Sequence, residues 1–181
     1  SLPLVVTNDA HYLRKTDAKM QDVLLCIQTG KTVDDPNRMK FETEEFYLKS
    51  EEELRQLKEA GLKLLYYGME TGDDATLKAV NKGVDGEQAV EAGRRVTASG
   101  MKLSMMIILG LAGAEGSERH ALATAKAINI IKPTHLSALC LMLYRGSELL
   151  DQYEAGKFNP LSPAGLMREL KLIIENIDLP A

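Results

Sequence analysis

Residues 64–72, LLYYGMETG, carry the signal that decides the fold. A run of apolar and aromatic residues, 64–67, stops at Gly68, passes one lone carboxylate at Glu70 and reaches a second glycine, Gly72. A short apolar run ended by glycine predicts a buried strand of a parallel sheet. Ligands of α/β proteins bind beyond the carboxyl ends of such strands. We therefore expect Glu70 to lie where a functional site would lie.

Units of helix, glycine, strand and glycine repeat on both sides of this stretch, which is typical of βα units and a parallel sheet. The predicted fold is α/β, a parallel sheet of four or five strands with flanking helices in one structural domain. Eight strands would close a (βα)₈ barrel, so the chain encodes about half of one. Strands are predicted near 4–8, 63–69, 102–109 and 135–143, with a weaker candidate at 45–49, and helices over 15–29, 50–60, 73–81, 86–99, 117–131 and 162–176.

An open half-barrel leaves strand edges and an apolar face uncovered. Two copies that cover each other would satisfy both, so the sequence predicts a homodimer. The net charge of −4 provides no basic surface, and we expect no nucleic-acid partner. No apolar run is long enough to span a bilayer, and the first residues lack the pattern of a signal peptide. The expectation is a cytoplasmic protein without a membrane partner.

Other residues with reactive side chains are expected to be inert. Cys26 and Cys140 are far apart in the sequence and have no basic neighbours, so both are predicted to be free, buried and unreactive. His120 is expected to be an exposed polar residue. The stretch 110–113, GLAG, precedes a helix but lacks the lysine of a phosphate-binding loop, so a plain turn is expected. The chain starts with Ser-Leu, which suggests an engineered or excised segment, although removal of an initial methionine would also leave serine.

From about Ser50 onward the chain resembles the carboxyl-terminal half of a radical S-adenosylmethionine (SAM) protein. The matching stretches include KSEEELRQLKEAGLKLLYYGMETGDDATLKAVNKG and EAGRRVTASGMKLSMMIILGLAGAEGSERHALATA. The resemblance implies a partial (βα) barrel in which the strand ending in Gly68 and Glu70 contacts the nucleoside of SAM. Gly110 ends the next strand, which borders the same pocket. Glu70 would accept hydrogen bonds from ribose hydroxyls. The alternative is a carboxylate satisfied by water or by nearby backbone donors.

The radical SAM family holds a [4Fe–4S] cluster on a CxxxCxxC loop after its first strand, because the cluster needs several thiolates from one loop. This chain has two cysteines in total, and neither lies in such a loop. From this we expect no cofactor, no iron–sulfur cluster and no reductive cleavage of SAM.

The first fifty residues resemble a different family. The stretch LVVTNDAHYLRKTDAKMQDVLLCIQTGKTVDDPNRMKFETEEFYLKS is similar to the end of the PHP (polymerase and histidinol phosphatase) domain in the alpha subunit of bacterial DNA polymerase III. In that domain an Asp-x-His at a strand end helps to hold metal ions, which implies Asp9 and His11 here. Two ligands rarely fix a catalytic metal, so the expectation is a weak divalent-metal site. The alternative is a hydrogen-bonded Asp–His pair.

The two resemblances meet near Tyr47–Ser50, and the hypothesis that follows is a chimera with one segment at 1–49 and another at 50–181. Each parent contributes part of a site, whereas catalysis needs a complete constellation. The leading functional expectation is a recombined (βα) scaffold without catalytic turnover, so we lean against an enzyme. The alternatives are a radical-SAM-like module that binds SAM or a nucleoside, a metal-dependent phosphoesterase remnant, or a module that binds a partner along a sheet edge.

Overall fold

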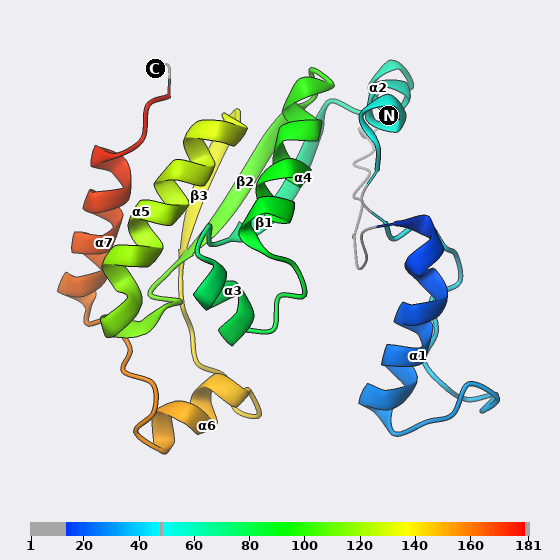
Figure 1. Cartoon of the computed structure of the whole chain (residues 1–181), viewed down its shortest axis with the longest axis horizontal. Coiled ribbons are helices and arrows are strands. Elements are labelled where there is room, and N and C mark those ends of the chain that lie inside the picture. Colours follow the sequence, from blue (N-terminus) through cyan, green and yellow to red (C-terminus); the bar gives the residue numbers. More distant parts are fainter. Residues whose placement is uncertain (1–13, 48, 180–181) are drawn as a thin grey trace, which may run out of the picture.

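The computed structural model describes residues 14–47 and 49–179. Its centre is a sheet in the order β1-β2-β3, formed by Leu64–Glu70, Lys102–Leu109 and His135–Cys140. Both neighbouring pairs are parallel, with Leu65 opposite Leu103 and Ser104 opposite His135. Because the strands are parallel, their carboxyl ends meet at one edge of the sheet. The ends of β1 and β2 therefore lie side by side (Figure 1).

Helices connect the strands and flank them. Five of the described α-helices start after a residue whose side chain accepts a hydrogen bond from the first turn, which satisfies a backbone N–H group that has no helical partner. Ser50 and Glu53 form a reciprocal capping box at the start of α2, and Ser162 precedes a proline at the start of α7. The helices are η1 Lys15–Asp17, α1 Ala18–Thr29, α2 Glu51–Glu59, α3 Asp74–Ala79, α4 Gly86–Ala98, α5 Gly113–Ile131, α6 Glu148–Glu154 and α7 Pro163–Glu175.

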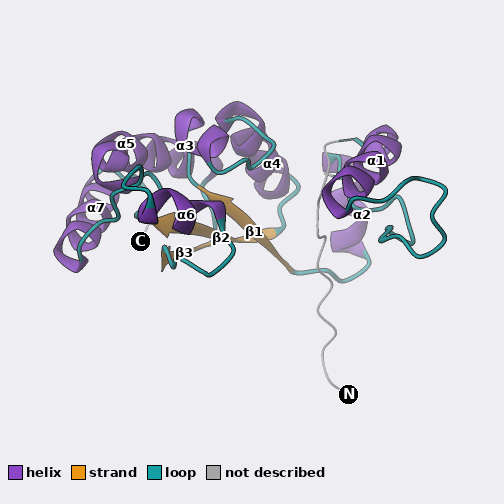
Figure 2. Ribbon diagram, turned by 90° about the horizontal axis from the view of Figure 1, so that it is seen from below, coloured by secondary structure: helices purple, strands orange, loops and turns teal. Residues whose placement is uncertain are grey.

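The hydrophobic core lies between the sheet and the helices on one of its faces (Figure 2). Alternate residues of the central strand β2, Leu103, Met105 and Ile107, are fully buried. They belong to the same cluster as Ile128 of α5 and Ile173 of α7. Side chains in a strand alternate between its two faces, so this buried set marks the face that the helices cover.

The opposite face of the sheet is uncovered in the part of the chain that the structure describes. Tyr66 of β1 is 54% exposed and Leu139 of β3 is 51% exposed. Every residue of β3 is exposed or half-buried. In both views α1 and α2 lie beyond the β1 edge of the sheet, and α1 is separated from the sheet (Figures 1 and 2). The sequence analysis anticipated this open face.

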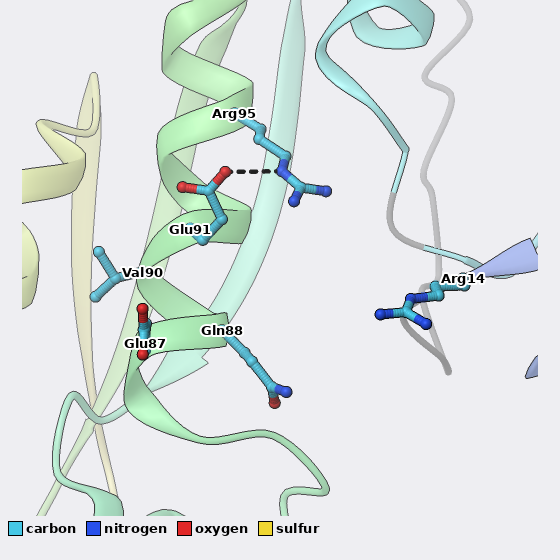
Figure 3. A pocket seen from close by; sticks show the side chains of 6 residues that line it. All are labelled: Arg14, Glu87, Gln88, Val90, Glu91 and Arg95. Atoms are coloured by element: carbon cyan, nitrogen blue, oxygen red, sulfur yellow. Dashed lines mark hydrogen bonds and ion pairs between the residues drawn. The ribbon is translucent and has the colours of Figure 1, made fainter.

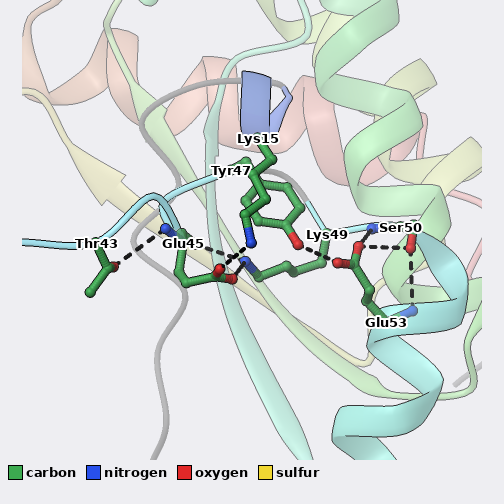
Figure 4. Close-up of polar contacts among 7 residues, drawn as sticks. All are labelled: Lys15, Thr43, Glu45, Tyr47, Lys49, Ser50 and Glu53. Carbon is green, nitrogen blue, oxygen red and sulfur yellow. Dashed lines mark hydrogen bonds and ion pairs between the residues drawn. The ribbon is translucent and has the colours of Figure 1, made fainter. Parts of the chain in front are cut away.

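The segment before residue 50 contacts α2 through a polar cluster (Figure 4). Lys15 and Lys49 donate hydrogen bonds to the carboxylate of Glu45 at 2.6 and 2.8 Å, and these bonds lower the pKa of Glu45 to about 2. The Tyr47 hydroxyl donates to Glu53, which raises the pKa of Tyr47 to about 12. The Tyr47–Glu53 contact crosses the predicted join and ties the two segments together locally.

The α/β class, the parallel sheet and the flanking helices are confirmed. Three strands are present in the described residues. The predicted strand at 4–8 lies outside the described residues, whereas the described residues of 45–49 contain an isolated bridge at Tyr47 and no strand. The helix predicted to begin at Ser117 begins at Gly113 instead. Within the described ranges, no helix is both long and apolar enough to cross a bilayer.

Candidate functional site

The end of β1 departs from a regular strand at Glu70. The pairing register with β2 shifts between Gly68 and Glu70, so that Gly68 lies opposite Met106 while Glu70 lies opposite Ile107. Glu70 has a φ of 65°, a left-handed conformation that residues with a side chain rarely adopt. Such strain costs on the order of 1–3 kcal/mol and is concentrated at functional sites. The bulge re-aims the Glu70 side chain at the carboxyl edge of the sheet.

Gly68 provides the space for the Glu70 carboxylate. A Cβ atom added at Gly68 would lie 2.4 Å from Glu70 Oε1, which is too short for a non-bonded contact. The carboxylate therefore folds back over the backbone of its own strand. Lys82 Nζ donates to the same oxygen at 3.2 Å. Lys82 lies between two left-handed residues, Asn81 and Gly83, in the turn that follows α3, and this turn returns its ammonium group to the strand end.

Gly110 follows β2 at the same edge and has a φ of 79°. Its N–H donates to Glu169 Oε1 at 2.6 Å, and an added Cβ would meet Leu166 at 2.9 Å. Glycine at this position is thus explained by its backbone conformation and by packing against the α7 side. Gly68, Glu70 and Gly110 lie at one edge of the sheet, where the Gly110 amide already has a partner, and their role in binding a cofactor stays a prediction.

A buried polar network lies beneath these strand ends. Thr71 Oγ1 and His120 Nδ1 are 2.7 Å apart, and His120 Nε2 lies 3.6 Å from Glu169 Oε1. The side chains of His120 and Glu169 are 0% exposed. Ser117 also donates to Glu169. Burial lowers the pKa of His120, although the nearby Glu169 and Asp73 oppose this shift.

The expectation of an exposed His120 was wrong. Its position in α5 holds the signal that would have corrected it, because Ser117, His120, Ala121 and Thr124 follow the i, i+3, i+4, i+7 spacing of one helix face. The last three of these are buried. A polar residue on such a stripe is expected to be buried with a partner. The partners come from Thr71 and Glu169, which are distant in sequence and could not be assigned from it.

Asp73 joins the loop after β1 to α3 and α5. Its side chain accepts a hydrogen bond from the Thr76 backbone at the start of α3, and Arg119 donates to both of its oxygens at 2.9 and 3.1 Å. Burial alone would raise the pKa of Asp73, but the hydrogen bonds from Arg119 and Thr76 outweigh it and hold that pKa below its usual range. Asp73 is therefore a structural carboxylate that is already satisfied.

The predicted metal ligands Asp9 and His11 lie outside the described residues. Among the residues that are described, no group of three or more His, Cys, Asp and Glu side chains is placed to hold a metal ion. Cys26 is buried in α1, whereas Cys140 ends β3 and is exposed, contrary to the expectation that both are buried. The exposure follows from the open edge that β3 forms.

A hollow in the described structure lies away from the Glu70 edge. It has a volume of about 440 Å³ and separates Arg14 from α4, where Glu87, Val90, Glu91 and Arg95 line it (Figure 3). Arg95 donates to Glu91 at 3.0 Å across one of its walls. Acidic and basic groups alternate there, so the hollow has no dominant charge to attract an ion.

The family model described as the Radical SAM superfamily matches residues 9–124. The chain belongs to the Radical SAM superfamily. The matched range contains the end of β1, the end of β2 and most of α5. It also extends across residue 50, so it does not locate a join there, and the boundary between 1–49 and 50–181 stays a prediction.

A shorter part of the chain matches DNA polymerase III subunit alpha. Over 56 residues, 31% of this chain, the sequence is 61% identical to that subunit from Treponema pallidum and 50% identical to that from Borreliella burgdorferi. The subunit from Mycobacterium tuberculosis is 49% identical over 57 residues. The chain spans about 5% of the length of these curated relatives. One chain thus combines a radical SAM match with a polymerase-subunit match, as the sequence analysis predicted.

Solved structures share the fold. An archaeal Elp3 from Methanocaldococcus infernus, with its N-terminus deleted, aligns with 70% of this chain and 29% of its own at a TM-score of 0.55 and 22% identity. Methylornithine synthase (PylB) aligns with 74% of this chain and 38% of its own, at a TM-score of 0.52 and 19% identity. HydG, a maturase of the [FeFe]-hydrogenase, aligns with 73% of this chain and 30% of its own, at a TM-score of 0.50 and 15% identity. At these identities the likeness shows the fold alone.

The family match corrects the expectation about cofactors. Members of the Radical SAM superfamily normally bind SAM and an iron–sulfur cluster, so the prediction that the chain has no cofactor was wrong at the level of its family. The Glu70 carboxylate at the strand edge offers acceptor oxygens of the kind that a ribose diol needs. The cluster does not fit this chain's own cysteines, because Cys26 and Cys140 are the only two and lie on separate elements.

Proposed function

We propose that this chain is a nucleoside-binding module of the Radical SAM superfamily, in which Glu70 receives the ribose of SAM or of a related nucleoside. The observation that carries the proposal is the strained Glu70 backbone, with its carboxylate placed over Gly68 at the open carboxyl edge of the sheet. A carboxylate has two acceptor oxygens, and a ribose presents two neighbouring hydroxyl donors. Membership of the family supports SAM as the source of the nucleoside.

Lys82 sets a condition on this binding. Its ammonium group occupies one Glu70 oxygen, while both side chains remain partly exposed. A partly exposed ion pair is worth little, so ribose hydroxyls can replace the Lys82 contact at small cost. The Lys82 ammonium group is then still close enough to offset the negative charge of Glu70 while the ribose diol binds to the Glu70 carboxylate. Gly110 contributes to the shape of the same edge rather than a donor, because its N–H binds Glu169.

The test is a binding titration with SAM, adenosine and 2′,3′-dideoxyadenosine, followed by calorimetry and thermal unfolding. We expect SAM and adenosine to bind and to raise the melting temperature, since a ligand that binds only the folded state stabilises it. The dideoxy analogue and Glu70→Gln should lose about tenfold or more in affinity, because a hydrogen bond to a charged group contributes about 1.5–3 kcal/mol. Glu59→Gln, which replaces an exposed carboxylate on α2, is the matched control. Equal, negligible heats for all ligands would reject the proposal.

The chimera remains a second part of the proposal. The radical SAM match and the polymerase-subunit match support an origin of the chain from two parents. In that case the described residues before 48 contribute no group to the nucleoside site. Asp22→Asn, which removes the ion pair of α1 with Arg38, should therefore leave the affinity for adenosine unchanged. A loss of affinity in this variant would contradict the division. The absence of catalytic turnover stays a prediction from the sequence.

A further inference from the structure

The strained backbone of Glu70 needs a cause that holds it in place. A left-handed residue with a side chain persists only where its surroundings fix its conformation. The two residues that follow Glu70 are both held from α5: Thr71 pairs with His120 through its hydroxyl at 2.7 Å, and the Gly72 N–H donates to Thr124 Oγ1 at 3.1 Å. Helix α5 therefore holds the backbone immediately after Glu70, the residue proposed to bind the ribose.

The second end of this network reaches the neighbouring strand. Glu169 of α7 accepts the Gly110 N–H after β2 at 2.6 Å and the Ser117 hydroxyl at the start of α5. His120 lies between Thr71 and Glu169, with Nε2 at 3.6 Å from Glu169 Oε1. The path from β1 through α5 and α7 to β2 thus connects the two strand ends that border the site. We call Thr71, His120 and Glu169 the interlock.

The contacts of the interlock are compatible with a neutral His120 that carries its proton on Nε2. Thr71 Oγ1 already accepts the Asp73 N–H at 2.9 Å, so its own proton is available for His120 Nδ1. With Nδ1 as acceptor, the neutral ring carries its proton on Nε2, directed toward Glu169. Among the described residues Nε2 has no hydrogen-bond partner. A buried polar group without a partner is costly, so the His120–Glu169 contact is the place where the interlock can still tighten.

We propose that the interlock positions the ribose-binding carboxylate: Thr71 and His120 hold Glu70 in its left-handed conformation, and Glu169 sets that strand end relative to the end of β2. The inference rests on the proposed nucleoside function for its ligand, but not for its geometry. Thr71, His120 and Glu169 are positioning residues, because none of them is expected to touch the ribose. A network that only stabilised the fold would leave Glu70 in the same conformation after substitution.

The experiment compares Thr71→Val, Thr71→Ser and Glu169→Gln with Asn129→Ala as the matched control. Asn129 also lies on α5, where it accepts the Asp178 N–H at 2.7 Å and donates to the Asn176 carbonyl at 2.9 Å, but it is near the opposite end of the helix from His120. Each protein is measured in three ways: the dissociation constant for adenosine, the free energy of unfolding, and the backbone NMR signals of residues 68–72 without ligand.

We expect Thr71→Val to weaken adenosine binding about tenfold and to shift the Glu70 amide signal toward that of a regular strand. Thr71→Ser restores the hydroxyl and should stay within about twofold of the wild type. Glu169→Gln should move the Thr71 signals although the two side chains are not in contact, and it keeps the test valid if Thr71→Val does not fold. Asn129→Ala should lower stability without changing affinity or the Glu70 signals.

Two results would overturn the inference. Thr71→Val and Glu169→Gln with unmoved Glu70 signals and unchanged affinity would show that the network is structural only. An equal response of Asn129→Ala would show that any destabilisation of α5 has the same effect. If the wild type does not bind adenosine, the proposed function fails, while the ligand-free NMR comparison still decides whether the interlock holds Glu70.

Discussion

The absence of a side chain at Gly68 determines where the Glu70 carboxylate lies. Gly68 has no side chain, and the Glu70 carboxylate occupies the position that a methyl group would take. Gly68→Ala should therefore displace the carboxylate and weaken nucleoside binding about tenfold, which corresponds to ~1.4 kcal/mol. The loss is measured by titration with adenosine. The strand itself should tolerate alanine, since φ at Gly68 is not in the left-handed range.

A double-mutant cycle separates this effect from a general disturbance of the strand. Residues in contact give non-additive changes in free energy. In a Glu70→Ala background there is no carboxylate to displace, so adding Gly68→Ala should cost no further affinity. Additive losses in the cycle would mean that Gly68 acts through something other than Glu70.

His120 gives a pH prediction whose sign is determined by its burial. Burial holds the pKa of folded His120 below its unfolded value of about 6.5. Below that pH the unfolded chain binds a proton at His120, whereas the folded protein does not. The contribution of His120 to the free energy of unfolding is therefore fully present above about pH 6.5 and is lost as the pH decreases toward the folded pKa. Urea unfolding between pH 7 and 5 should show this slope.

Two substitutions distinguish His120 from other titrating groups. His120→Asn should be less stable at pH 7 and should flatten the slope, because the group that gains the proton on unfolding is gone. His135→Asn removes an exposed histidine at the start of β3 and should leave the slope unchanged. A slope that persists in His120→Asn would assign the pH dependence to other groups.

The position of Glu70 could be predicted from the sequence, but its conformation could not. A glycine-ended apolar run is a local signal, and it located the strand end correctly. The Lys82 contact and the hydrogen bonds of Thr71 and Gly72 depend on residues 12 to 52 positions away in the chain. Single-sequence patterns do not report such pairings. The family resemblance placed Gly110 beside the same pocket but did not reveal its packing against Leu166 of α7, and its role at the site stays a prediction.

At the level of secondary-structure elements, the loop that follows β1 packs closely against helix α5 at Gly72. A Cβ added at Gly72 would lie 2.5 Å from the backbone oxygen of Ala123 and 3.0 Å from Ala127 Cβ. Backbone atoms in the middle of a helix cannot move away without disrupting hydrogen bonds. Gly72→Ala should therefore lower the free energy of unfolding by about 2–3 kcal/mol, at the upper end of the overpacking range.

The matched comparison is Gly83→Ala, in the turn that carries Lys82. An added Cβ there meets nothing within 4 Å, although φ is 79°. Its cost should be the conformational penalty alone, about 1 kcal/mol. Urea unfolding of both variants measures the difference. Equal costs at the two positions would contradict the close approach of β1's exit to α5.

Strong periodicity made the elements around β1 and β2 predictable, and caps made several of their boundaries predictable. The capping box at Ser50 and the proline after Ser162 are read from four residues of sequence and are present as expected. Weak periodicity led to errors. The stretch 45–49 alternates poorly and forms polar contacts to Lys15 and Glu53 instead of pairing as a strand. Helix α6 was not predicted, because its seven residues are too few for a clear period.

For the whole molecule, two apolar surfaces lie uncovered in the described chain. One is the open sheet face, with Tyr66 and Leu139 more than half exposed. The other is a stripe on α1, where Met20 is 66% exposed and Ile27 is 70% exposed. Exposed apolar patches of this kind on a monomer indicate association. The homodimer predicted from the sequence thus stays a prediction, and these surfaces support it.

The dimer has a direct test in sedimentation. We expect a mass of twice 19.9 kDa, since burial of apolar surface drives association. The mass should fall to the monomer value on dilution, because dilution shifts the equilibrium toward the monomer. Leu139→Lys places a charge on the open sheet face and should shift the mass toward the monomer at every concentration. Leu122→Lys is the matched control, because Leu122 is exposed on α5, on the face of the sheet that the helices cover. A wild type that sediments at 19.9 kDa throughout, or equal responses of the two variants, would reject an interface on the open sheet face.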